Sequence, residues 1–148
     1  MNKWPKFNEH GDLPVGIYQT TLTDVLEHFG EGTPQRRIVA RRLQRIYSEV
    51  VKTGHLYRFI IFGSFITEKP TPGDLDIFLL MGNSFDVRKL PMEVAVLFNH
   101  MIAQNYEGAS VFWMRRLSVL EEEEKTIEYW QLKRNGTKRG IVEVIKND

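Results

Sequence analysis

The chain has 148 residues, of which 42% are hydrophobic and 26% are charged, a composition typical of a folded globular domain and not of a disordered segment. Its 20 basic and 19 acidic side chains leave a formal net charge of +1, which excludes binding to nucleic acid through overall charge. The absence of cysteine excludes disulfides, thiolate nucleophiles and cysteine-bound zinc. The polar N-terminus and the lack of an apolar run of about 20 residues predict a cytoplasmic protein without a signal peptide or membrane anchor.

The chain length suits one hydrophobic core, so a single domain is expected over residues 1–148. Residues 1–16 carry prolines and glycines without periodicity, which predicts an extended N-terminal arm that wraps the domain. Apolar residues then recur at helical spacing between threonine caps and glycine stops, which predicts two helices. The first begins at Thr21 or Thr23 and ends at Phe29, and the second covers residues 33–53.

From residue 57 onward, β-branched and aromatic runs predict strands, while a long apolar pattern and a charged segment predict helices. The predicted strands cover residues 57–62, 74–81, 109–114 and 140–145. The predicted helices cover residues 87–105 and 121–134. This alternation favours an α/β (α+β) fold in which helices flank a mixed central sheet, although the strand order cannot be read directly.

The strongest candidate site combines a glycine-serine pair with two aspartates. Asp74 and Asp76 are two positions apart on a predicted strand, so their side chains point to the same face and can converge on one metal ion. Hard cations such as Mg²⁺ are commonly held by one or two carboxylates together with substrate phosphates. Gly63 lets the backbone approach a ligand, and Ser64 adds a hydroxyl and an amide suited to a triphosphate. Each pair alone is most simply a turn or a strand entrance, but their joint spacing favours a site.

At these residues the sequence resembles the DNA polymerase β-like nucleotidyltransferase superfamily. Its signature is a strand, Gly-Ser, roughly ten residues, and then Asp-hydrophobic-Asp on the next strand, which Gly63-Ser64 and Asp74-Leu75-Asp76 match. The wider chain is similar to small bacterial nucleotidyltransferase-like proteins. The stretches that carry this wider resemblance are Leu13-Pro14-Val15-Gly16, Gly63-Ser64-Phe65-Ile66-Thr67 and Pro72-Gly73-Asp74-Leu75-Asp76.

The resemblance implies a reaction in which an acceptor hydroxyl attacks the α-phosphate of a nucleoside triphosphate and pyrophosphate leaves. It implies that Asp74 and Asp76 are the catalytic carboxylates and bind Mg²⁺ or Mn²⁺. It further implies that Ser64 holds the terminal phosphates while Gly63 lets the backbone come close. The acceptor is then a protein, an RNA or a small molecule, and small transferases of this type can act beside a partner protein.

Active members of the superfamily usually carry a third carboxylate on a later strand. The predicted strand 109–114 has none, and Ser110 occupies the equivalent position. Glu107 and Glu143 are candidate substitutes, although each is more simply a surface residue. Two functions therefore remain open, a metal-dependent nucleotidyltransferase and an inactive domain of the same fold that binds nucleotide or a protein partner.

Three other groups of residues are candidates for binding. Arg37, Arg41 and Arg45 recur at four-residue spacing on the long predicted helix; this face could meet RNA or nucleotide phosphates but is more simply solvated. The loop 135–140 is basic but lacks the Walker pattern, which favours a hairpin-like connection. Four aromatic residues could stack on a base, although aromatic residues at such spacings usually lie in the core. They are Phe112, Trp113, Tyr129 and Trp130.

Overall fold

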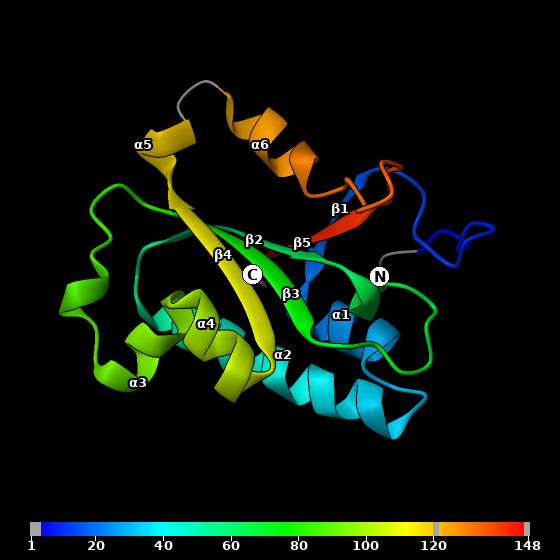
Figure 1. Cartoon of the computed structure of the whole chain (residues 1–148), viewed down its shortest axis with the longest axis horizontal. Coiled ribbons are helices and arrows are strands. Elements are labelled where there is room, and N and C mark those ends of the chain that lie inside the picture. Colours follow the sequence, from blue (N-terminus) through cyan, green and yellow to red (C-terminus); the bar gives the residue numbers. More distant parts are fainter. Residues whose placement is uncertain (1–3, 120–121, 147–148) are drawn as a thin grey trace.

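The computed structural model describes residues 4–119 and 122–146, and these residues form one five-stranded sheet (Figure 1). The strands are β1 (Ile17–Thr21), β2 (Leu56–Phe62), β3 (Leu75–Met81), β4 (Ala109–Arg115) and β5 (Ile141–Ile145). Their order across the sheet is β1-β5-β2-β3-β4. β1 runs parallel to β5 and β3 runs parallel to β4, whereas β2 is antiparallel to both of its neighbours. The sheet is therefore mixed.

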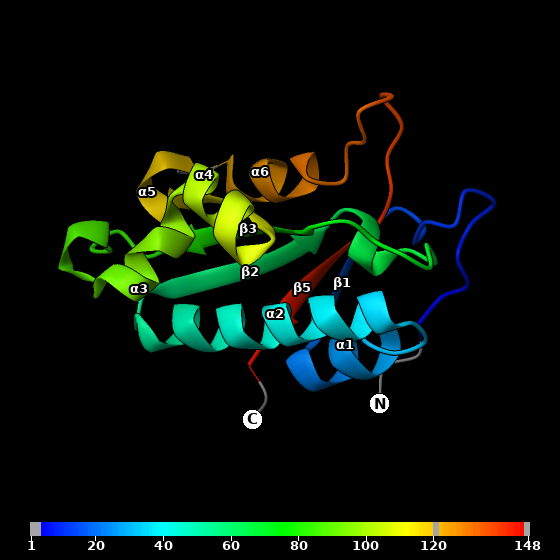
Figure 2. The same ribbon diagram turned by 60° about the horizontal axis from the view of Figure 1, so that its bottom comes forward.

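Helices pack on both faces of this sheet (Figure 2). The first face is covered by α1 (Leu22–Phe29) and α2 (Pro34–Lys52), and the second by α5 (Arg116–Val119) and α6 (Glu123–Tyr129). Thr21 and Thr33 cap the first two helices, because their hydroxyls accept hydrogen bonds from backbone N–H groups of the first turn. The predicted α/β (α+β) fold class is confirmed, and so are the two helices predicted before residue 54.

Side chains alternate along β3, which separates the main core from the face that carries the candidate site. Leu75, Ile77 and Leu79 are fully buried in the core beneath α1 and α2. Phe78 points the other way and packs with residues of α5 and α6. Asp76 lies on this second face. The acidic side chain thus interrupts neither hydrophobic cluster.

The predicted helix over residues 87–105 is wrong, because this segment breaks into short helical turns. Pro91 is extended and precedes one turn, and Asn99 is extended and caps the next by accepting a hydrogen bond from the N–H of Ile102. Some apolar residues of this segment nevertheless face the interior, since Leu97 and Phe98 are buried in the core. The turns in this segment are η2 (Val87–Lys89), α3 (Met92–Ala95), η3 (Val96–Phe98), α4 (His100–Ile102) and η4 (Ala103–Glu107). One further short turn, η1 (Ser64–Ile66), follows β2.

The two ends of the described chain also differ from the prediction. β1 is not among the predicted strands, because it is short and its partner β5 is remote in the sequence. The arm that precedes it packs on α1 through Trp4, whose ring stacks on His28 at 4.9 Å between centroids. The helix predicted over residues 121–134 begins at Glu123 and ends at Tyr129, and residues 1–3 and Glu121 lie outside the described part. None of the described helices combines the length and the apolar character needed to cross a bilayer.

Candidate functional site

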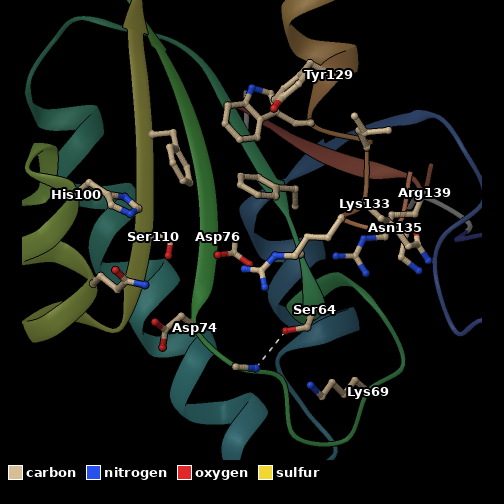
Figure 3. A pocket seen from close by; sticks show the side chains of 18 residues that line it. Ser64, Lys69, Asp74, Asp76, His100, Ser110, Tyr129, Lys133, Asn135 and Arg139 are labelled. Atoms are coloured by element: carbon tan, nitrogen blue, oxygen red, sulfur yellow. Dashed lines mark hydrogen bonds between the residues drawn. The ribbon is translucent and has the colours of Figure 1, made fainter. Parts of the chain in front are cut away.

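The four residues of the predicted site line one cavity of about 970 Å³ on the second face of the sheet. Gly63 and Ser64 follow β2, while Asp74 precedes β3 and Asp76 lies on it. Because β2 and β3 are antiparallel neighbours, the end of the first meets the beginning of the second. Figure 3 shows Asp74, Asp76 and Ser64 around the same opening.

Asp76 is the most perturbed carboxyl group in this cavity. It is the register partner of Phe62 on β2 and of Ser110 on β4. Burial raises its pKa to about 6, and the negative charge of Asp74 adds to this increase, while Arg139, Ser110 and Arg134 oppose it. The carboxylates of Asp74 and Asp76 therefore lie close together in a partly buried site, where their negative charge favours a bound cation.

Replacing Asp76 with asparagine is expected to stabilise the free protein at neutral pH. Because the pKa of Asp76 is raised from 3.8 to about 6, the folded state binds its proton more tightly than the unfolded state. Stability is therefore lost as pH rises from about 4 to about 6, and Asp76→Asn removes that loss. We expect a gain of about 1–2 kcal/mol at pH 7, after allowance for solvent screening.

Urea unfolding of the wild type and Asp76→Asn at about pH 7.5 and about pH 3, each at least about one unit beyond the range of this transition, measures the gain. The two proteins should differ at the higher pH and converge at the lower, where Asp76 is protonated in both folded and unfolded states. A variant less stable than the wild type at neutral pH would contradict the cost of burying the ionised Asp76 carboxylate beside Asp74.

Gly63 is the one position of the site where only glycine fits. Its backbone lies at φ +84° and ψ −163°, a region that side chains other than hydrogen rarely adopt. A Cβ atom at this position would lie 2.1 Å from Oδ2 of Asp76. The glycine therefore allows the backbone after β2 to lie directly against the acidic pair.

A buried arginine holds the loop that follows Gly63. Arg36, on α2, is 6% exposed, and burial lowers its pKa from the ordinary arginine value. Its Nη1 donates to the carbonyl oxygens of Phe29 and Phe65 at 3.0 and 2.7 Å. Its Nη2 donates to those of Thr67 and Lys69 at 2.5 and 2.6 Å. One cation thus fixes the path of residues 65–69, on which the position of Ser64 depends.

Ser64 joins the two halves of the predicted motif. Its Oγ accepts a hydrogen bond from the backbone N–H of Gly73 at 3.1 Å, shown as a dashed line in Figure 3. This contact links the turn after β2 to the segment that enters β3. The serine hydroxyl still lines the cavity, where its proton can be donated to an anionic ligand.

Basic side chains form a second part of the cavity wall, which we call the basic rim. It consists of Lys69, Lys133, Arg134 and Arg139. The loop 135–140 is a hairpin-like connection as predicted, with a bridge between Leu132 and Lys138, and its own Arg139 also lines the site. Sequence reasoning missed the other three. For Lys133 and Arg134 the signal was only a local excess of basic residues near the turn, and Lys69 is remote from that turn in the sequence.

Two of these cations are positioned by Asp12 of the N-terminal arm. Its carboxylate accepts from Lys133 Nζ at 2.7 Å and from Arg139 Nη1 at 3.2 Å. Although burial raises the pKa of Asp12, the hydrogen bonds from Lys133 and Arg139 bring it below its ordinary value. The arm also contacts the opposite loop, because the carbonyl of Gly11 accepts a hydrogen bond from the N–H of Glu68 at 3.0 Å.

Neither candidate for a third carboxylate reaches the aspartate pair. Glu107 forms an ion pair with Arg45 of α2. Glu143 is buried and accepts from Arg58 at 2.7 and 2.9 Å. Across residues 4–119 and 122–146, no cluster of three or more histidine or acidic side chains is arranged to hold a metal ion. His100, Gln104 and Ser110 line the cavity on the β4 side instead.

The arginines of α2 lie apart from this cavity. Arg37, Arg41 and Arg45 are exposed, and the last of them is paired with Glu107. None of the three is among the cavity's described lining residues. The interpretation of this helix face as solvated therefore agrees with the structure.

The fold and the site together define an α/β domain whose mixed sheet carries an acidic pair and a basic rim in one cavity. The chain belongs to DUF6932, a family of unknown function, whose sequence model matches residues 5–145. Comparison with curated proteins and with solved structures gave no match.

Proposed function

We propose that this protein is a metal-dependent nucleotidyltransferase that moves a nucleoside monophosphate from a nucleoside triphosphate to an acceptor hydroxyl. The observation that carries the proposal is that Gly63, Ser64, Asp74 and Asp76 line one cavity together with the basic rim. Acids that suit a cation and bases that suit phosphates thus lie in the same opening. The resemblance of these residues to the DNA polymerase β-like superfamily supports the same reaction.

The donor set fits Mg²⁺ or Mn²⁺ when a nucleotide is bound at the same time. Asp74 and Asp76 offer hard oxygen ligands. Burial and then the negative charge of Asp74 raise the pKa of Asp76, and a bound divalent cation would favour its ionised form. Two carboxylates leave most coordination positions open to phosphate oxygens and water. When bound, the metal would neutralise charge on the reacting phosphate and activate the acceptor hydroxyl.

The side chains of the cavity supply positioning and charge for this reaction. Ser64 and Lys69 lie where the terminal phosphates would be held, and Arg134 and Arg139 add positive charge for the departing pyrophosphate. The acceptor hydroxyl releases its proton to water and its oxygen forms a bond to the α-phosphorus, while the bond from that phosphorus to the pyrophosphate oxygen breaks and the electron pair leaves with pyrophosphate. Gly63 keeps the backbone close enough to Asp76 for the phosphates and the acidic pair to share the opening.

The absence of a third carboxylate beside Asp74 and Asp76 in the described part of the chain favours a second function. Because no third carboxylate joins Asp74 and Asp76 among the described residues, metal affinity and activation of the acceptor would both be weak. The alternative is therefore a domain of this fold that binds a nucleotide or a protein partner without turnover.

Ligand-dependent stability and label transfer test the proposal together. An NTP with Mg²⁺ or Mn²⁺ is expected to raise the melting temperature, and Asp74→Ala with Asp76→Ala is expected to abolish that shift. Incubation with α-labelled triphosphates and with the protein itself, RNA or cell extract as acceptors should give metal-dependent label transfer. The matched control is Asp86→Ala, because Asp86 pairs with Arg88 and is not among the described residues lining the cavity.

The outcomes separate the two functions. A melting shift with label transfer that the double variant loses supports the enzyme. A melting shift without transfer to any acceptor supports the binding domain. An unchanged melting curve in the presence of metal and every triphosphate would overturn the site itself.

A further inference from the structure

The cavity has an aromatic wall that the proposed reaction does not use, which we call the aromatic shelf. It consists of Phe62, Phe112, Tyr129 and Trp130. Trp130 lies between the two phenylalanines, with ring centroids 4.7 Å from Phe62 and 5.1 Å from Phe112. Tyr129 meets Trp130 edge to face at 5.3 Å. Residues from β2, β4 and the end of α6 thus form one continuous set of rings.

These rings are more exposed than a core position requires. Tyr129 is 62% exposed and Phe112 is 37% exposed. The neighbour of Phe112 in the sequence, Trp113, points to the other face of β4 and packs at right angles to Phe85 at 5.3 Å. The core interpretation from the sequence is therefore correct for Trp113, whereas Phe112 and Tyr129 present ring surface that a flat ligand can cover.

The shelf begins beside the acidic pair. Phe62 is the register partner of Asp76, and Phe112 lies two positions beyond Ser110 on the same face of β4. In Figure 3, Tyr129 lies above Asp76 and Lys69 lies below it, while Arg139 lies to the right of Asp76. One part of the cavity thus suits a chain of phosphates and another part suits a flat apolar group, and the two carboxylates line the same cavity.

We propose that the aromatic shelf stacks the base of the nucleoside triphosphate, with its phosphates directed toward Ser64 and the basic rim. This inference rests on the proposed function, because it assigns the place of the base within the same cavity. Stacking on a ring face depends on the π surface of the base and not on its hydrogen-bonding edge, so the shelf accepts different bases and binds purines most tightly.

Titration calorimetry with ATP and with inorganic tripolyphosphate, each with Mg²⁺, tests this assignment. The wild type is expected to bind ATP about tenfold or more tightly than tripolyphosphate, which has no base. The double variant Phe112→Leu/Tyr129→Leu keeps apolar volume but removes two ring faces. It should lose about tenfold in affinity for ATP and leave the affinity for tripolyphosphate unchanged. The control is Tyr106→Leu, since Tyr106 is exposed and is not among the described residues lining the cavity.

Each other outcome overturns the shelf in a different way. Equal affinities of the wild type for ATP and tripolyphosphate would mean that the base makes no contact, while the phosphate site of the proposed function would survive. Preference for ATP that the double variant retains would place the base elsewhere. If neither ligand binds, the proposed function fails and the shelf fails with it. Circular dichroism of the double variant confirms that any loss is not unfolding.

Discussion

Replacing Arg36 with methionine is expected to lower the free energy of unfolding by about 3 to 5 kcal/mol. The methionine fills a similar volume but donates no hydrogen bond. Four backbone carbonyls, of Phe29, Phe65, Thr67 and Lys69, would then lose a charged donor. Since most of these contacts are buried, water can replace the guanidinium only at a cost. We also expect a weaker nucleotide-dependent melting shift, because the loop after Ser64 loses its support.

Arg37→Met is the matched control for this change. Arg37 is the next residue on α2 but is exposed, so its replacement should alter the free energy of unfolding by less than about 0.5 kcal/mol. Denaturant unfolding of the three proteins measures the difference. Equal stabilities of the Arg36 and Arg37 variants would show that the loop holds its path without the buried cation.

Gly63→Ala is expected to cost about 3 kcal/mol of stability and to abolish nucleotide-dependent stabilisation. The new methyl group would need a backbone conformation that alanine avoids, and it would occupy space held by the Asp76 carboxylate. The carboxylate must then move or the turn must open. Either change separates the acidic pair from Ser64 and the basic rim.

The control for Gly63 is Gly54→Ala. Gly54 also has a positive φ, of 76°, but a Cβ atom there would meet nothing within 4 Å. This variant should therefore show the backbone strain alone, about 1 kcal/mol, and keep the nucleotide response. Thermal melting with and without Mg²⁺ and a triphosphate compares the two. A Gly63→Ala protein that responds to nucleotide as the wild type does would show that the close approach to Asp76 is dispensable.

The central part of the site could be predicted from sequence because its determinants are local. The two-residue spacing brings Asp74, just before β3, and Asp76, on β3, into one cavity, and the strand that ends at Phe62 lies next to Asp76. The predicted helices before residue 54 are correct for a similar reason, because Thr33 and its following proline act on the adjacent turn. Whether the site binds metal and nucleotide stays a prediction.

The rest of the site depends on contacts between distant segments. Lys133 and Arg139 enter the cavity wall through Asp12, which lies near the opposite end of the chain. Glu143 is unavailable to the acidic pair because β5 is adjacent to β2, where Arg58 holds it. The periodic pattern of apolar residues in a sequence does not indicate which distant segments contact each other. The breaks at Pro91 and Asn99 were local signals, but the regular apolar spacing around them favoured a continuous helix.

The position of β5 also has a consequence for biosynthesis. This strand lies between β1 and β2, and it is the neighbour with which β1 pairs. The register partners Gln19 and Glu143 are 124 positions apart, so the ribosome must make nearly the whole described chain before β1 can join the sheet. Until β5 is made, β1 and the edge of β2 that faces β5 lack a hydrogen-bonding partner in this sheet. Arg58 likewise lacks its ion-pair partner Glu143. Three residues of the basic rim, Lys133, Arg134 and Arg139, come just before β5 in the chain, so the rim is completed late in synthesis, after the aspartate pair has been translated.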